Sequence, residues 1–185
     1  MNKLIAILTI LLLPVTATAY DGLEINKPLT IGIATYKSVI SFDNPYYYTE
    51  DDELSGFALS LGYAMSDQFA LRGTYFFLEH DDFSDIESSG FDLLGYIGVG
   101  LASPGLKAYV GGGLFRDEWE LGSFDKTFDG LQLNGGVGYN WDAVALEFVL
   151  GLRDASDYED FVNEIFATGF DATAVTYSLM LSVRL

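Results

Sequence analysis

The sequence predicts an all-β fold, an eight-stranded antiparallel up-and-down transmembrane β-barrel. Acidic residues recur in four clusters at near-equal intervals along the chain. Successive clusters are separated by two runs of residues. In each run, bulky apolar residues alternate with small or polar ones, as expected of a β-strand. If each run is a strand, all four clusters lie at the same end of the sheet, which is the plan of a small membrane barrel with long polar loops on one side.

The four clusters contain 20 of the 27 acidic residues. Carboxylates are ligands for hard cations, but the clusters lack the ligand spacing and the glycine of a calcium loop. We therefore interpret them as solvated, repulsive outer loops, with weak divalent-ion bridging to lipopolysaccharide left open. The clusters are Asp43, Glu50, Asp51, Asp52 and Glu53; Glu79, Asp81, Asp82, Asp85 and Glu87; Asp117, Glu118, Glu120, Asp125 and Asp129; Asp154, Asp157, Glu159, Asp160 and Glu164.

The amino terminus has the form of a cleavable secretory signal. Lys3 precedes an apolar run over residues 4–13, and the small residues Ala17 and Ala19 flank Thr18 in the pattern that signal peptidase accepts. The apolar run is too short to span a bilayer. We expect residues 1–19 to be the signal peptide and residues 20–185 to form a single outer-membrane barrel domain.

Composition excludes several classes of function. Loss of Lys3 with the signal changes the formal charge from −18 to −19, so no basic surface is present to bind nucleic acid. The chain has no cysteine, which excludes disulfides and thiolate metal sites. We expect no metal site and no cofactor.

The predicted strands follow one another with short turns at one end and acidic loops at the other. The run over residues 29–38 is the least regular, whereas residues 56–63 alternate without a break. The strands are predicted at residues 29–38, 56–63, 69–77, 90–101, 106–115, 131–141, 144–152 and 173–185, with short turns at residues 66–68, 102–105 and 140–142.

The alternation predicts which face meets lipid. Residues of the less apolar phase are mainly Gly, Ala, Ser and Thr, which suit the narrow interior of an eight-stranded barrel. The bulky phase must then face acyl chains. Aromatic residues near the strand ends predict two interfacial girdles. We assign Tyr63, Phe69, Tyr139 and Trp141 to the girdle near the short turns, and Tyr75, Phe77, Phe91, Trp119 and Phe170 to the girdle near the acidic loops.

The carboxyl-terminal run carries a resemblance to a known family. Residues 173–185 alternate to the last position, like the terminal strand that the barrel-assembly machinery recognises. With the signal and the loop layout, the chain resembles the small OmpA/OmpX-like outer-membrane barrels (opacity-protein/porin-family type). Leu185 departs from the usual terminal Phe or Trp. The resemblance implies a Gram-negative outer-membrane location, contact with outer-membrane lipid and lipopolysaccharide, and a monomer.

Six charged residues fall on the predicted lumen face, namely Arg72, Asp92, Lys107, Glu147, Arg153 and Arg184. The third and seventh strands are opposite in a ring of eight, so we predict that Arg72 and Glu147, with Lys107, pair across the lumen and plug it. Hydration of each charge separately is the alternative. We expect Tyr36, Tyr96, Gln132 and Asn134 to complete a polar network that stiffens the barrel.

The sequence offers two further candidate sites at the predicted outer rim. Lys37, Arg116 and Lys126 are candidate contacts for lipopolysaccharide phosphates. His80, beside Asp81 and Asp82 and near Ser84, raises the idea of a lipid A-modifying enzyme, since barrels of similar size use a His with a Ser and a carboxylate. The chain has no His-x-Ser motif, and an exposed loop histidine is the favoured interpretation.

These patterns predict a non-enzymatic outer-membrane protein with no catalytic residue. Its expected role is structural or surface-interactive, of the adhesin/OmpX-like kind, because side chains fill the lumen of a barrel of this size. A narrow ion or small-solute channel is the first alternative. A lipid A-modifying enzyme is the second.

Overall fold

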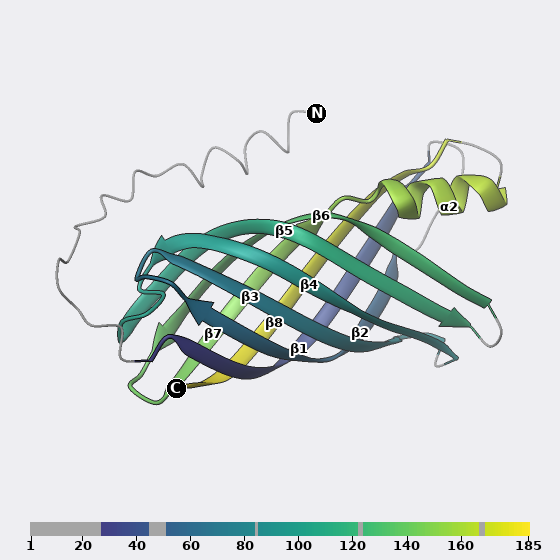
Figure 1. Cartoon of the computed structure of the whole chain (residues 1–185). Coiled ribbons are helices and arrows are strands. Elements are labelled where there is room, and N and C mark those ends of the chain that lie inside the picture. The colour runs from purple at the N-terminus through teal and green to yellow at the C-terminus, as the bar shows by residue number, and fades with distance from the viewer. Residues whose placement is uncertain (1–26, 45–50, 84, 122–123, 167–168) are drawn as a thin grey trace.

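The computed structural model describes residues 27–44, 51–83, 85–121, 124–166 and 169–185. Eight antiparallel strands form a closed barrel in sequence order, and β1 pairs with β2 and with β8 (Figure 1). The predicted fold class is thereby confirmed. The strands are β1 Leu29–Asp43, β2 Asp52–Ala64, β3 Phe69–His80, β4 Ile86–Val99, β5 Gly105–Leu121, β6 Phe124–Asn140, β7 Val144–Arg153 and β8 Asp171–Arg184. The predicted signal peptide lies outside the described residues.

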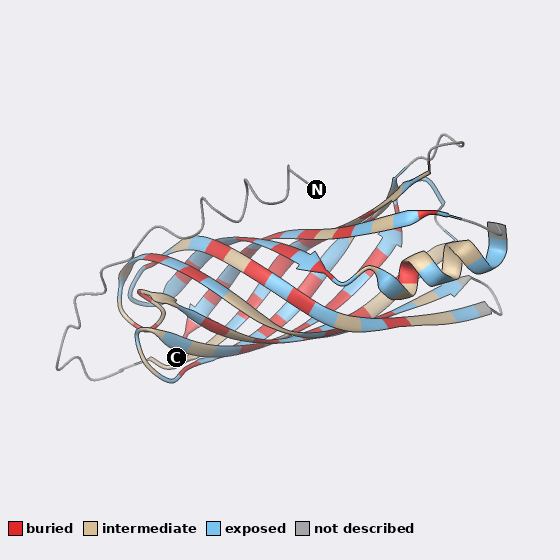
Figure 2. Ribbon diagram, turned by 90° about the horizontal axis from the view of Figure 1, so that it is seen from above, coloured by how far each residue is buried: buried red, intermediate tan, exposed pale blue. Residues whose placement is uncertain are grey.

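The side chains alternate along each strand so that apolar residues face outward, as the sequence predicted and opposite to the arrangement in a water-soluble barrel. Buried and exposed residues alternate along the strands (Figure 2). The exposed phase is bulky and apolar, as at Ile33, Phe57 and Leu133, which are 55%, 50% and 62% exposed. The buried phase holds small, polar and charged residues together with a set of aromatic and aliphatic side chains. The outside of the cylinder is therefore apolar, whereas the interior combines polar and charged side chains with buried aromatic rings such as Phe76 and Phe115.

The outward orientation that the predicted aromatic girdles require is observed at all but two of the assigned positions. The four residues assigned to the short-turn end and Tyr75, Phe77 and Phe91 near the acidic loops are all exposed on the outer face. Trp119 and Phe170 are the exceptions. Trp119 packs edge-on against Phe128, and Phe170 is buried. These two rings belong to the interior of the outer end and not to a lipid interface.

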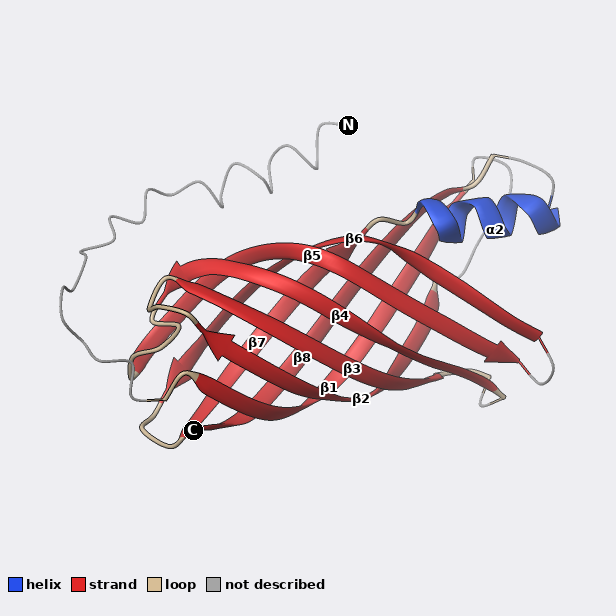
Figure 3. Cartoon of the chain, viewed as in Figure 1, coloured by secondary structure: helices blue, strands red, loops and turns tan. Residues whose placement is uncertain are grey.

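Two acidic segments are more ordered than predicted. The third cluster was expected to be a loop, but β5 and β6 continue as a paired hairpin from Asp117 opposite Phe128 to Leu121 opposite Phe124. The fourth cluster contains a helix, α2, Ser156–Phe166, which lies at the end of the barrel opposite the C-terminus (Figure 3). In the described part of the chain, no helix is both long and apolar enough to cross a membrane.

Polar side chains join the short turns at the other end. Asp67, between β2 and β3, accepts hydrogen bonds from the backbone N–H groups of Gly100, Ala102 and Ser103 at 3.2, 3.2 and 2.9 Å, and from the Ser103 hydroxyl at 2.6 Å. Gly100 has φ of +69°, a backbone conformation that favours glycine. Asn140 donates to the carbonyls of Gly100 and Ser103 at 2.7 and 2.9 Å. The turns at this end are therefore tied into one unit.

Replacing Asp67 with alanine is expected to lower the free energy of unfolding by on the order of 1 kcal/mol at pH 7, since water screens this exposed carboxylate. Burial raises the pKa of Asp67, but the hydrogen bonds from Ser103, Ala102 and Gly100 outweigh it and leave the pKa below its ordinary value. A carboxylate with a lowered pKa stabilises the fold above its unfolded pKa of about 3.9, and this stabilisation is lost as the pH falls through the folded pKa. Denaturant unfolding of both proteins at pH 7 and pH 3 should show the difference shrinking in acid. A constant difference would exclude the ionised carboxylate as its source.

Candidate functional site: the barrel lumen and the outer rim

A cluster in the half of the lumen nearer the short turns is centred on Glu147 of β7. Its carboxylate accepts hydrogen bonds from Arg72 of β3 at 2.7 Å, from Lys107 of β5 at 2.5 Å and from the Tyr109 hydroxyl at 2.6 Å. Arg72 also donates to the Tyr109 hydroxyl at 3.0 Å. The three residues predicted to pair across the lumen therefore lie together, on strands from different sides of the barrel.

The surroundings of Arg72 add a second attraction. Its guanidinium carbon lies 5.2 Å from the ring centroid of Tyr96 and 5.5 Å from that of Tyr109, within the range of cation–π contacts. The Glu147 side chain is 1% exposed and that of Lys107 is 4% exposed. Because a buried charge without a partner is strongly unfavourable, each charge in this cluster needs the others to remain buried.

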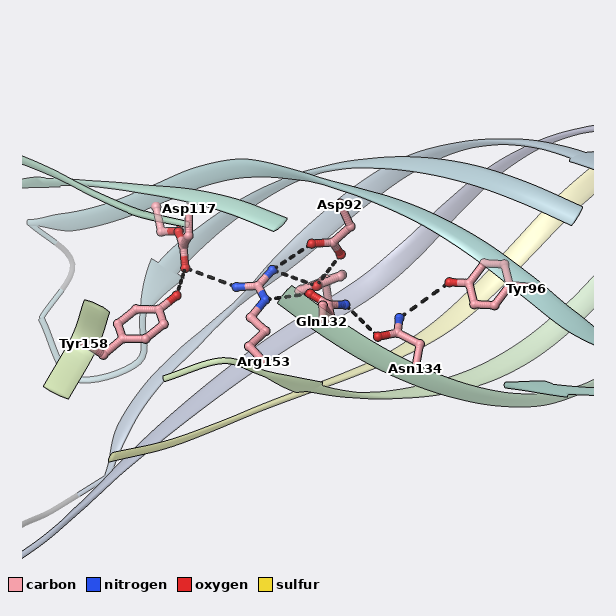
Figure 4. A network of polar contacts seen from close by, with 9 residues as sticks. Asp92, Tyr96, Asp117, Gln132, Asn134, Arg153 and Tyr158 are labelled. Atoms are coloured by element: carbon pink, nitrogen blue, oxygen red, sulfur yellow. Dashed lines mark hydrogen bonds and ion pairs between the residues drawn. The ribbon is translucent and has the colours of Figure 1, made fainter. Parts of the chain in front are cut away.

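A second cluster, nearer the acidic end, is centred on Arg153 of β7 (Figure 4). The guanidinium donates to Asp92 at 3.0 Å, to Asp117 at 3.2 Å, to the Tyr36 hydroxyl at 3.0 Å and to Gln132 at 2.9 Å. These acceptors come from four strands, β4, β5, β1 and β6. Arg153 of β7 thus links four other strands of the barrel.

Aromatic rings enclose the Arg153 guanidinium. Its central carbon lies 4.9 Å from the ring centroid of Phe76 and 4.6 Å from that of Phe115. The side chain is 0% exposed. Burial between rings removes the competing water, so the contacts with the two carboxylates are stronger than they would be at a surface.

A chain of polar side chains runs between the two clusters. Gln132 donates to Asn134 at 2.7 Å, and Asn134 donates to the Tyr96 hydroxyl at 3.5 Å (Figure 4). The Tyr96 ring in turn faces Arg72. Three of the residues predicted to form a polar network, Tyr96, Gln132 and Asn134, belong to this series of hydrogen bonds. The fourth, Tyr36, is bonded to Arg153. A cavity of about 20 Å³ beside Arg72, Lys107 and Tyr96 has room for about one water molecule.

Helix α2 packs against β6 and β8 at the outer end of the barrel, and its Tyr158 is 1% exposed. The Tyr158 ring stacks on Phe128 at 4.2 Å between centroids and lies parallel to Phe115 at 6.4 Å. Its hydroxyl donates to Asp117 at 2.8 Å, so it is linked to the Arg153 cluster (Figure 4). Three groups of buried side chains therefore lie inside the barrel, namely the Glu147 cluster, the Arg153 cluster and the aromatic group around Tyr158.

The start of α2 follows from its sequence. Asp154 accepts hydrogen bonds from the backbone N–H and the hydroxyl of Ser156 at 3.1 and 2.7 Å, and these bonds lower the pKa of Asp154. Acidic residues in the first turn are stabilised by the helix dipole. Tyr158, Phe161 and Val162 have helical spacing, and this signal could have predicted the helix.

The three cations proposed at the outer rim do not converge. Lys37 is ion-paired with Glu53 at 2.5 Å and Asp81 at 2.8 Å. Hydrogen bonds from Lys37 and Ser55 lower the pKa of Asp81. Arg116 is exposed on β5. Lys126 lies 5.2 Å from the ring centroid of Phe161 in α2. A shared phosphate site for these residues therefore has no support in their arrangement and stays a prediction.

His80 is not an exposed loop residue, so that interpretation of the sequence was wrong. It is the last residue of β3 and is buried at the outer rim, opposite Leu54 of β2. Because alternate residues of a strand point to the same side, the inward orientation of Leu78, two residues earlier, could have predicted that His80 is buried. Ser84 lies outside the described residues. Within the described ranges, no group of three or more His, Asp or Glu side chains is arranged to hold a metal ion.

The fold is similar to those of small outer-membrane barrels of known structure. Ail, the attachment invasion locus protein of Yersinia pestis, aligns with a TM-score of 0.58 at 12% identity over 86% of this chain and 99% of Ail. Neisserial surface protein A aligns with a TM-score of 0.56 at 16% identity over 85% and 97% of the two chains. A complex of Ail with the heparin analogue sucrose octasulfate aligns with a TM-score of 0.52 at 14% identity, covering 86% of this chain and 99% of that one. No protein-family model and no curated protein matches the sequence.

Proposed function

We propose that this chain is an outer-membrane protein of Gram-negative type with a structural or surface-interaction role and a sealed lumen. The observation that carries the proposal is the burial of charged and aromatic side chains inside the barrel, in the Glu147 cluster, the Arg153 cluster and the aromatic group around Tyr158. Wide aqueous pores need about twice as many strands. The barrel thus offers its outer loops, and not a passage, as the functional surface.

The outer face of the barrel supports the membrane location. Leu59, Leu93, Leu131 and Leu179 are all more than half exposed and belong to four different strands. Exposed apolar surface of this extent is unfavourable in water, at about 25 cal/mol per Å². Acyl chains remove that penalty. The similarity in fold to Ail and Neisserial surface protein A agrees with this environment.

A planar-bilayer recording of the purified mature chain tests the sealed lumen. We expect no steady current above that of the bare membrane, with a large porin as the positive control. Sustained single-channel steps would favour the channel alternative. That alternative has one observation in its favour, the polar chain through Gln132 and Asn134, which could admit ions if the ion pairs exchanged partners.

Charge argues against a sulfated polysaccharide as the surface partner. Ail has been captured with a heparin analogue, but the outer end of this barrel carries exposed carboxylates such as Asp82, Glu118 and Asp125. Lys37 is neutralised by two carboxylates. Repulsion between like charges lowers association, so a cationic partner fits the loops better. Retention on a polycation resin but not on heparin, at low salt, is the expected result, and the reverse would contradict it.

The enzyme alternative is weaker in the structure than in the sequence. His80 accepts two backbone hydrogen bonds through Nδ1, and Asp81 is bonded to Lys37 and Ser55. No hydroxyl among the described residues is hydrogen-bonded to the imidazole. A nucleophile and its base must be within hydrogen-bond reach. Overexpression is expected to leave the mass of lipid A unchanged, and a gained or lost acyl chain would restore the enzyme alternative.

A further inference from the structure

His80 holds the start of the loop between β3 and β4. It is the single histidine of the chain, and its side chain is 4% exposed. Nδ1 accepts hydrogen bonds from the backbone N–H groups of Asp82 at 3.1 Å and Phe83 at 3.3 Å. The Phe83 ring packs against the imidazole at an interplanar angle of 50°, with 5.2 Å between ring centroids. The loop segment Asp81–Phe83 therefore folds back onto the side chain that precedes it.

These contacts indicate which tautomer the neutral imidazole adopts. A ring nitrogen that accepts two hydrogen bonds carries no proton, so the N–H of the neutral ring is on Nε2. Nε2 faces the Asp52 carboxylate of β2 at 3.5 Å. A second proton could be added only at Nδ1, where it would meet the two N–H groups that are now bonded there.

The charged groups around His80 are mainly carboxylates. Asp52 approaches from β2, and Asp81 and Asp82 are on the loop itself. Lys37 of β1 is held by Asp81 and by Glu53 of β2. On the β4 side, Asp85 precedes the strand and Glu87 lies opposite Glu79, all three exposed. Apart from Lys37, which is already paired, every one of these groups is an anion.

We propose that His80 is a pH-operated latch for the backbone of Asp82 and Phe83 at the outer rim. At a pH above the midpoint of this protonation, neutral His80 binds the loop through Nδ1. When solvent supplies a proton to Nδ1, the nitrogen becomes a donor, the two loop bonds break, and the imidazolium pairs with Asp52 through Nε2. Histidine is the side chain whose charge ordinarily changes between about pH 5 and 8.

Protonation of His80 is expected to release only a short segment of the loop. Asp81 stays bound to Lys37 and to the Ser55 hydroxyl, and Ile86 donates to the Phe83 carbonyl at 2.9 Å. The released part is therefore the turn at Asp82 and Phe83. Phe83 is already 62% exposed, so acidification changes how an aromatic ring is presented on the acidic surface. This inference does not depend on the proposed function.

Nitrogen-15 NMR of the full mature chain in nanodiscs tests the latch between pH 8 and pH 5. The ring nitrogens of His80 and the backbone amides of Asp82 and Phe83 should titrate with one shared midpoint, while amides of β8 stay unchanged. If the ring titrates and the two amides do not follow it, the proposal is overturned.

Two variants separate the latch from general acid effects. His80→Asn keeps an oxygen that can accept from the backbone two residues on, so the loop should stay folded and the shared transition should vanish. Asp52→Asn removes the anion that receives the imidazolium, so the midpoint should move to lower pH. A transition that persists in His80→Asn, or a midpoint that Asp52→Asn leaves in place, would refute the latch.

Discussion

Replacing Glu147 with alanine is expected to lower the free energy of unfolding by about 3–5 kcal/mol, the usual effect of removing one partner of a buried ion pair. The change leaves the Arg72 and Lys107 cations buried without their shared carboxylate. It also removes an acceptor from the Tyr109 hydroxyl. Guanidinium unfolding in lipid vesicles, followed by tryptophan fluorescence, measures the difference.

Matched variants distinguish the buried pair from a general loss of acidic charge. Glu118→Ala changes an exposed carboxylate of β5 and should alter stability by no more than about 0.5 kcal/mol. Glu147→Gln keeps the shape and one acceptor, so its effect should be intermediate. Equal effects of the buried and the exposed substitutions would show that the Glu147 cluster does not brace the barrel.

The same variant tests whether the Glu147 cluster is a gate. If the ion pairs block a path for ions, Glu147→Ala should increase the current across a planar bilayer relative to the unmodified chain. An unchanged current would mean that the cluster is a brace only. Stability and conductance are separate readouts, so either result on conductance leaves the expected loss of stability intact.

Replacing Arg153 with methionine is expected to lower the free energy of unfolding by a similar amount, about 3–5 kcal/mol. Methionine retains apolar packing near Phe76 and Phe115. The carboxylates of Asp92 and Asp117 lose the cation that lies between them, in an interior where unpaired charge is most unfavourable. The same denaturant measurement applies.

Two comparisons give the Arg153 prediction its control. Arg116→Met removes an exposed cation from β5 and should have little effect. A triple variant that combines Arg153→Met with Asp92→Asn and Asp117→Asn should regain part of the lost stability, since neutral amides need no counterion. If the triple variant is less stable than Arg153→Met, the loss does not arise from unpaired carboxylates.

The strand phases and the interior charges could be predicted because they depend on a period of two, which is local information. Arg72, Lys107 and Glu147 each stand between outward residues, and the barrel closure then brings them together. Which of the lumen cations meets which anion depends on register and side-chain reach. The role of Arg153 as the second centre was for that reason not predicted.

The ends of the strands were harder to predict. Asp117 was assigned to a loop because it stands in an acidic cluster, yet it shares the inward phase of Phe115 and is 1% exposed. A β-ladder continues past the bilayer wherever cross-strand pairs support it, so polarity alone does not mark its end. Helix α2 was missed for the same reason, since its acidic residues concealed the helical spacing of Tyr158 and Phe161.

The central claim is that the bulky side chains face acyl chains, and spin labels test it most directly. The chain has no cysteine, so Leu133→Cys and Leu179→Cys can each carry one label, with Asp125→Cys as an exposed outer-end control. In lipid vesicles, labels at 133 and 179 should collide often with dissolved oxygen and rarely with a water-soluble nickel complex, and the label at 125 should do the opposite. Labels at 133 and 179 that collide mainly with the nickel complex would contradict the account.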